Sequence, residues 1–138
     1  MLPIEILMNN KTKYINTTGL LDDFEDVYNF HKSMREYKET PLYNLRKLAS
    51  KLNVKNICVK DESYRFGLNA FKGLGASYAL EQIIKENPHA NYTFVSCTDG
   101  NHGKALAWRA NTLGYKSIIF MPKGSEERRV KAIEKYGA

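Results

Sequence analysis

Apolar residues recur at helical intervals over most of the chain. Val27, Phe30 and Met34 repeat in this way near the start, and the same spacing returns in later segments. The pattern predicts helices over residues 21–37, 42–53, 69–85 and 100–113, and a further helix capped by Ser125. Stop signals at Pro88 and Gly114 support two of these helix ends.

Runs rich in β-branched and aromatic residues indicate three strands, at residues 56–60, 92–98 and 117–121. Because these strands alternate with helices, the expected fold class is α/β, with a partial parallel sheet in a three-layer α/β/α arrangement. Three strands are few for such a sheet, and the chain stops after a helix C-cap glycine, Gly137. We therefore expect a truncation at the C-terminus, with residues 1–39 as a helical arm and residues 40–138 as the α/β part.

Length and composition are those of one folded domain. The 138 residues include 43% hydrophobic ones, enough for a core, and 26% charged ones, which argue against disorder. No apolar run approaches the ~20 residues that span a membrane, and the N-terminus lacks the features of a secretory signal. We expect a cytoplasmic protein with no membrane partner. Cys58 and Cys97 sit in apolar runs and are expected to be reduced and buried.

The net charge of +6 raises the question of a nucleic-acid partner. The basic residues are dispersed among acidic ones, however, and no aromatic-basic signature of an RNA-binding module is present. We expect a solvated surface and no nucleic-acid partner, although the charge would suit an anionic small ligand. His31 and His89 lack partners at metal-ligand spacing, so we expect no metal and place both on the surface.

A glycine-rich turn joins the strand at residues 92–98 to the next helix. Its sequence, Thr-Asp-Gly-Asn-His-Gly, begins at the carboxyl end of that strand, where α/β sheets bind ligands. Gly100 and Gly103 allow close backbone approach, and the helix N-terminus offers free N–H groups with a partial positive charge. A carboxylate or phosphate would suit this place. A structural alternative, with Asp99 or Asn101 as a simple helix cap, fits these residues equally well.

Lys72 stands between Phe71 and Leu74 in an otherwise apolar helical pattern. One interpretation is an ordinary lysine whose amine reaches water along its aliphatic stem. The other is a lysine in a pocket that removes its solvent, which would leave a neutral, nucleophilic amine able to form a Schiff base. Periodicity alone favours the first interpretation.

Three segments together resemble one enzyme family. They are KDESYRFGLNAFKGLGASYAL at residues 60–80, TDGNHGKALAW at residues 98–108 and MPKGSEER at residues 121–128. From about residue 40 onward the chain is similar to the N-terminal part of the diaminopropionate ammonia-lyase family. Those enzymes depend on pyridoxal phosphate and belong to the tryptophan-synthase-β-like group, fold type II. Asp99 favours this family over the serine and threonine dehydratases, which usually have serine or alanine there.

The resemblance implies a role for each residue of these motifs. It implies that Lys72 is the Schiff-base lysine, that Asn101 lies near the pyridoxal 3-oxygen, and that Asp99 is a second base. The loop that receives the substrate carboxylate would comprise Thr98, Gly100 and His102. The implied cofactor is pyridoxal 5'-phosphate. The implied reaction is α,β-elimination from 2,3-diaminopropionate, which yields pyruvate and ammonia in an enzyme that acts as a homodimer.

Members of this family are several hundred residues long, and their glycine-rich phosphate loop lies downstream of the part that this chain resembles. We therefore expect an N-terminal portion of such an enzyme, with weak activity or none on its own. Two alternatives stay open. One is a related serine/threonine dehydratase or β-replacement enzyme, and the other is an inactive remnant or a module that depends on a partner chain.

Overall fold

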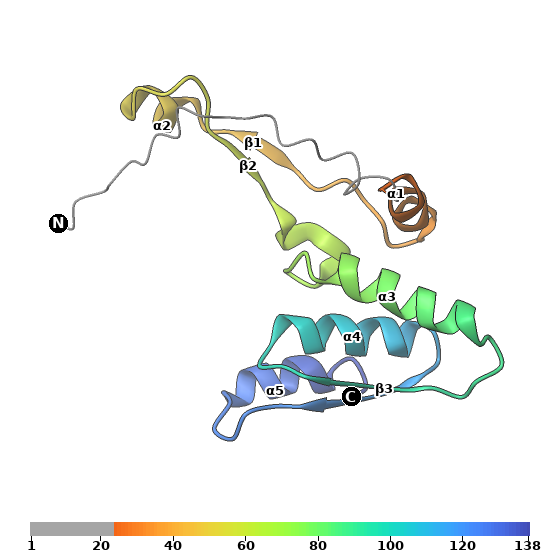
Figure 1. Ribbon diagram of the computed structural model, residues 1–138. Coiled ribbons are helices and arrows are strands. Elements are labelled where there is room, and N and C mark those ends of the chain that lie inside the picture. The colour runs from red at the N-terminus through yellow and green to blue at the C-terminus, as the bar shows by residue number, and fades with distance from the viewer. Residues whose placement is uncertain (1–23) are drawn as a thin grey trace, which may run out of the picture.

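The computed structural model describes residues 24–138 (Figure 1). The start of the predicted helix over residues 21–37, and most of the expected N-terminal arm, lie outside the described residues. In chain order the elements are α1 (Phe24–Ser33), β1 (Leu42–Asn44), α2 (Arg46–Lys51), β2 (Cys58–Lys60), the 3₁₀ helix η1 (Glu62–Gly67), α3 (Gly73–Glu86), β3 (Thr93–Cys97), α4 (Asn101–Thr112), β4 (Lys116–Phe120) and α5 (Glu127–Glu134).

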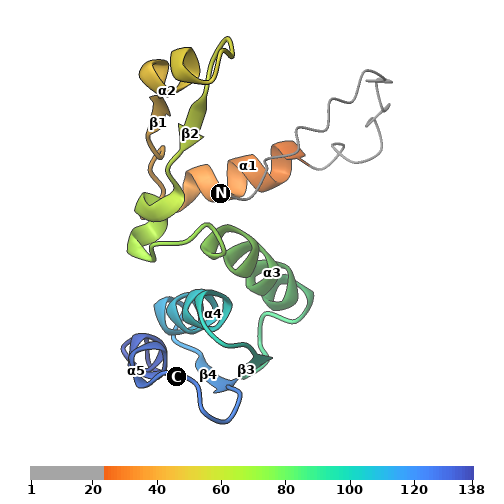
Figure 2. The ribbon, with the colours of Figure 1, turned by 90° about the vertical axis from the view of Figure 1, so that its left-hand side faces the viewer.

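Strands β1 and β2 form an antiparallel pair with Tyr43 opposite Val59. Together with α2 they make a β-hairpin-like projection, residues 42–60, that extends away from α3, α4 and α5 (Figures 1 and 2). The predicted helix over residues 42–53 is therefore wrong at its start, because the backbone of residues 42–44 pairs with β2 instead of continuing into α2. The expectation that the strand at residues 56–60 joins one parallel sheet is also wrong for the described residues.

Strands β3 and β4 lie parallel, with Val95 opposite Ile118. Helix α4 connects them, which makes a β–α–β unit, and α4 also packs beside α3 and α5 (Figure 2). Alternate strand residues face opposite sides of a sheet. Phe94 is accordingly buried, whereas Val95 and Ile118 are about half exposed. The predicted parallel α/β unit is confirmed here, and both strand positions match the sequence pattern closely.

Helix α3 begins at Gly73, so the predicted start at Asn69 is wrong. The reason is a run of left-handed backbone immediately upstream, with φ values of +53° at Phe66, +69° at Gly67 and +55° at Asn69. A right-handed helix cannot continue through such residues. The chain therefore turns sharply between η1 and α3 before Lys72, which becomes the N-cap of α3.

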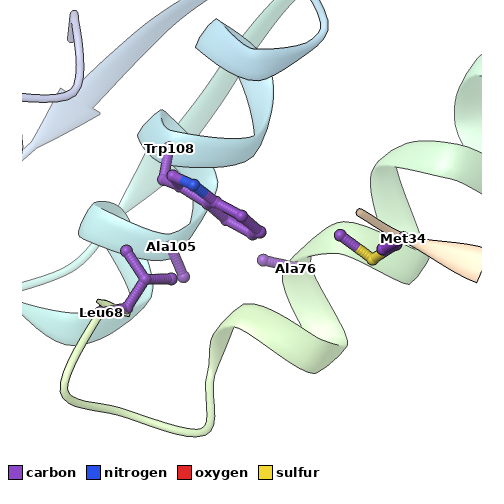
Figure 3. Packing of buried hydrophobic residues seen from close by; sticks show 5 residues of the cluster. All are labelled: Met34, Leu68, Ala76, Ala105 and Trp108. Carbon is purple, nitrogen blue, oxygen red and sulfur yellow. The ribbon is translucent and has the colours of Figure 1, made fainter. Parts of the chain in front are cut away.

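A small apolar core joins the end of α1 and the turn before α3 to helices α3 and α4. Its buried residues are Met34, Leu68, Ala76, Ala105 and Trp108 (Figure 3). The Trp108 indole of α4 stacks on the Phe66 ring at 4.9 Å between ring centroids. This contact, worth more than its buried area alone, fixes the turn before α3 against α4.

Two expectations about single residues are corrected by burial. His31 was expected at the surface but is only 6% exposed, because its side chain leaves α1 toward α3 and contacts the Leu74 carbonyl there. Cys58 and Cys97 are free, as expected, but exposed rather than buried. Within residues 24–138, no helix is long and apolar enough to cross a membrane, and no cluster of metal-binding side chains occurs.

Candidate active site

The turn after β3 carries most of the predicted site residues. Thr98 is half-buried, and its Oγ1 accepts a hydrogen bond of 3.3 Å from the Gly100 N–H. Asp99 and Asn101 are exposed, and His102 is half-buried in the first turn of α4. Gly100 occupies the N-cap position, with no side-chain cap. Because the usual cap is absent, the first N–H groups of α4 remain available to a ligand.

Gly103 lets α4 start close against the ends of both strands. A Cβ added there would lie 2.6 Å from the Thr98 Cγ2 and 2.8 Å from the Ile119 Cγ2, far inside van der Waals contact. Only glycine therefore fits without a shift of the helix. The close approach brings the free end of α4 to the edge of the sheet where β3 ends.

A pocket of about 520 Å³ opens at this edge. It is lined by Asn69, Asp99, Gly100, Asn101, Lys104, Arg128, Arg129 and Ala132. Three predicted site residues, Asp99, Gly100 and Asn101, thus share one cavity. Lys72, Thr98 and His102 are not among the lining residues, although Asn69 brings the turn before Lys72 to the rim.

The charges around this pocket favour an anion. Arg129 Nη1 donates to Asp99 Oδ2 at 2.9 Å, so the one carboxylate in the lining is already paired. Lys104 and Arg128 add two further cations, next to the positive end of the α4 dipole. Partial burial lowers the pKa of the Lys104 ammonium because it loses solvent. A carboxylate would be attracted by Lys104, by Arg128 and by the positive end of α4.

Lys72 ends the turn that leads into α3, and its side chain is exposed. The neighbouring Phe71 ring is 60% exposed. A Cβ added at Gly75, one turn further on, would meet no atom within 4 Å. An accessible primary amine, an uncovered aromatic ring and open space beside the helix together fit a planar carbonyl cofactor attached to Lys72. The fit concerns attachment only, because no phosphate cradle adjoins the lysine in the described residues.

A buried ion-pair network holds the segment before Lys72. Arg65 is 5% exposed and contacts both carboxylate oxygens of Glu62 at 2.9 Å. The Thr40 hydroxyl donates to Glu62 at 2.6 Å, and the Arg65 guanidinium donates to the Lys38 carbonyl at 2.9 Å. The hydrogen bonds that Glu62 accepts, first from Arg65 and then from Thr40, lower its pKa to about 2. Glu62 therefore has a structural role, and Lys60 joins the same network because its Nζ donates to the Thr40 carbonyl at 2.6 Å.

Sequence reasoning missed five lining residues: Asn69, Lys104, Arg128, Arg129 and Ala132. A signal for the two arginines was available, because they belong to the helix that follows β4, as Asp99 belongs to the turn that follows β3. The carboxyl ends of adjacent parallel strands share one edge of a sheet. Asn69 carried a weaker signal, since asparagine is one of the few residues that readily adopts positive φ.

Comparison with known proteins gives a consistent result. Residues 34–138 match the family described as "Pyridoxal-phosphate dependent enzyme". The chain is 46% identical over 125 residues to diaminopropionate ammonia-lyase of Escherichia coli K12, a match that covers 79% of this chain and 31% of that protein. It is 41% identical over 133 residues to the Salmonella typhimurium LT2 protein of that name, covering 82% of this chain and 33% of the relative.

Weaker similarity extends to a biosynthetic L-threonine dehydratase of Salmonella typhimurium LT2. The identity is 33% over 98 residues, covering 71% of this chain and 18% of the dehydratase. Among solved structures, the E. coli diaminopropionate ammonia-lyase in complex with an aminoacrylate-PLP azomethine reaction intermediate superposes with a TM-score of 0.79 and 46% identity. That match covers 83% of this chain and 32% of the enzyme.

These comparisons confirm the predicted fold class, a partial α/β unit of the tryptophan-synthase-β-like type. The chain spans about a third of the length of these two ammonia-lyases, 31% and 33%.

Proposed function

The chain belongs to the pyridoxal-phosphate dependent enzyme family, and we propose that it serves the α,β-elimination of 2,3-diaminopropionate to pyruvate and ammonia. The observation that carries this proposal is the 46% identity with the E. coli ammonia-lyase, against 33% with the threonine dehydratase. The pocket supports it, because an amino-acid substrate brings a carboxylate to a site rich in cations.

We assign Lys72 as the residue that attaches the cofactor. Its amine is exposed at the N-cap of α3, where no helical packing covers it. When bound, pyridoxal phosphate draws electrons from the substrate's α-carbon and so makes the Cα proton acidic. With the cofactor bound, the Lys72 amine would be the group that removes that proton from one face of the substrate.

Asp99 is the base that we assign to the opposite face. Arg129 engages its Oδ2, so Oδ1 is the oxygen left to accept a proton. The N–H groups at the start of α4, with Thr98, Gly100 and His102, would bind the substrate carboxylate. Asn101, the first residue of α4, would donate to the cofactor's 3-oxygen. Two bases on opposite faces would allow both D and L substrates to react.

The attachment site is tested by incubating the chain with pyridoxal phosphate, reducing it with borohydride and mapping the labelled peptide by mass spectrometry. We expect label on Lys72 well above the other lysines, because its amine is both exposed and next to open space. Lys72→Arg should remove this label, whereas Lys85→Arg, an exposed lysine in the last turn of α3, should leave it unchanged. Label spread evenly over many lysines would contradict the assignment.

The reaction is tested on a fusion of this chain with the region of the E. coli relative that follows the matched part. We expect release of pyruvate from D- and L-2,3-diaminopropionate, with Lys72→Ala inactive on both. Asp99→Asn should lose D-substrate turnover far more than L-substrate turnover. Equal loss on both enantiomers would remove the two-base proposal. Faster turnover of L-threonine or L-serine than of diaminopropionate would favour the dehydratase alternative.

We also infer that the enzyme is a cytoplasmic homodimer. Two free, exposed cysteines suit a reducing compartment. The exposed leucines Leu45, Leu48 and Leu52 around α2 supply apolar surface for a second copy. Sedimentation of the fusion should give the dimer mass, and a monomer at micromolar concentration would contradict this inference.

A further inference from the structure

His31 is a buried imidazole on α1, whereas residues 25–30, 32 and 33 of that helix are exposed or half-exposed. It is 6% exposed, and the ring of Phe30 packs edge-on against it at 5.0 Å between centroids. Tyr78 of α3 lies 6.3 Å from the imidazole centroid and also packs edge-on against Phe30 at 5.4 Å between centroids. A polar ring in such surroundings must have a hydrogen-bond partner, because an unmet polar group in a core is costly.

The partner is the backbone of α3. His31 Nε2 lies 2.8 Å from the Leu74 carbonyl oxygen, a distance typical of a strong hydrogen bond. A carbonyl oxygen only accepts, so Nε2 carries the hydrogen and donates it. The buried Ser77 hydroxyl donates to the same carbonyl at 3.0 Å, and its oxygen lies 3.3 Å from Nε2. Two side chains thus converge on one carbonyl.

That carbonyl belongs to the turn next to Lys72. Lys72 is the N-cap of α3, and its own carbonyl accepts from the Ala76 N–H at 3.2 Å. The preceding residue, Phe71, accepts from the Leu74 N–H at 3.0 Å. Leu74 is therefore linked to the Lys72 turn through its N–H, which bonds to Phe71, and to α1 through its carbonyl, which bonds to His31.

We propose that His31 is a positioning residue for Lys72. By donating to the Leu74 carbonyl, it fixes the rotation of the first turn of α3 about the helix axis, and so the direction in which the Lys72 side chain leaves the backbone. Van der Waals contact between α1 and α3 would leave this rotation less defined, since apolar packing is non-directional. The inference rests on the proposed function, which gives Lys72 its role.

A matched pair of substitutions separates the hydrogen bond from the packing. His31→Gln keeps an N–H donor at a similar reach, whereas His31→Met has similar length and no donor. Met34→Ala serves as the control, because Met34 follows α1 directly, is 8% exposed and contributes packing alone. The histidine at position 89 is exposed, and His89→Met controls for loss of any histidine.

The first measurement is the share of borohydride-fixed pyridoxal label that falls on Lys72 in this chain. We expect His31→Met to lower that share about tenfold, the population change that follows from losing one buried hydrogen bond. His31→Gln should restore most of it. Met34→Ala and His89→Met should keep the wild-type share under conditions where they are folded. A wild-type share in His31→Met would overturn the proposal.

The second measurement needs no cofactor. Backbone amide exchange, followed by NMR, should be faster at residues 75–78 in His31→Met than in Met34→Ala at equal overall stability. If wild-type Lys72 takes no selective label, the proposed function fails, and the exchange data still decide whether His31 holds this turn. Equal exchange rates in the two variants would show that His31 acts through packing alone, and the proposal would fall.

Discussion

Two arginine–carboxylate pairs of the same length flank the candidate site, and they differ in burial. Arg65 meets Glu62 at 2.9 Å upstream of Lys72, with side chains 6% and 24% exposed. Arg129 meets Asp99 at 2.9 Å beside the turn before α4, with side chains 45% and 65% exposed. Distance alone would make them equivalent. The surrounding dielectric makes them different, because water screens the second pair and largely not the first.

The difference in burial shows that the two pairs have different roles. One stabilises the segment before Lys72 (the lysine side), and the other orients Asp99 in the turn before α4 (the acid side). The buried pair, tied also to Thr40, holds the left-handed turn that presents Asn69 and Lys72. The exposed pair only orients Asp99 and can open at little cost. The lysine side is thus fixed by the fold, whereas the acid side can adjust to what enters the pocket.

The largest expected effect comes from breaking the buried pair. Glu62→Gln leaves the Arg65 guanidinium buried without its counter-charge, which costs about 3 kcal/mol of unfolding free energy. Urea unfolding followed by circular dichroism measures it. Glu126→Gln, which removes an exposed partner of Arg129, is the control and should change stability by less than about 0.5 kcal/mol. A similar loss of unfolding free energy in both variants would contradict the distinction between the buried and the exposed arginine–carboxylate pair.

The second prediction concerns the packing of the helix start beneath the adjustable Asp99–Arg129 pair, at Gly103 of α4. Gly103→Ala forces a methyl group against Thr98 and Ile119 and should cost about 2 kcal/mol. Gly75→Ala, on the lysine side, meets open space and should stabilise α3 by about 0.5–1 kcal/mol. Thermal unfolding of the two variants measures both. Tolerance of alanine at position 103 would mean that α4 can slide, contrary to the close contact described above.

The pH dependence of stability should follow Glu62. Its pKa is lowered from 4.5 to about 2 in the folded chain, so its stabilising contribution is complete above pH 4.5 and is lost as the pH falls toward 2. After allowance for solvent screening, we expect a loss of about 1–2 kcal/mol over that window. Unfolding midpoints between pH 2 and 6 measure it, with Glu62→Gln as the variant that lacks the slope. An equal slope in both proteins would assign it to other carboxylates.

The smallest effect belongs to the exposed pair. Arg129→Gln should change the unfolding free energy by less than about 1 kcal/mol, and the change should shrink further in high salt. Glu62→Gln should show little salt dependence over the same range. A large, salt-independent effect at Arg129 would place this pair in the same class as Arg65 and would contradict the comparison.

Local patterns predicted most of the α/β part. Strands β3 and β4, helix α4 and its end before Gly114 all follow from short-range periodicity and turn residues. The predictions were wrong where long-range pairing determines the secondary structure. Residues 42–44 have a helical pattern, but they form a strand because they pair with β2. The predictions were also wrong at residue 69, where positive φ at three nearby positions delays α3.

The sequence by itself determined where strands β3 and β4 and helix α4 lie, because residue type and spacing are local properties. Through its family resemblance it also predicted Lys72 and the glycine-rich turn that begins at Thr98 as the residues of the site. Only the tertiary structure decided that Arg129 pairs with Asp99, that Arg65 locks the turn before Lys72, and that His31 is buried against the Leu74 carbonyl. These contacts join positions 30 or more residues apart, or depend on burial, and no local pattern encodes which side chain loses its water when the helices pack.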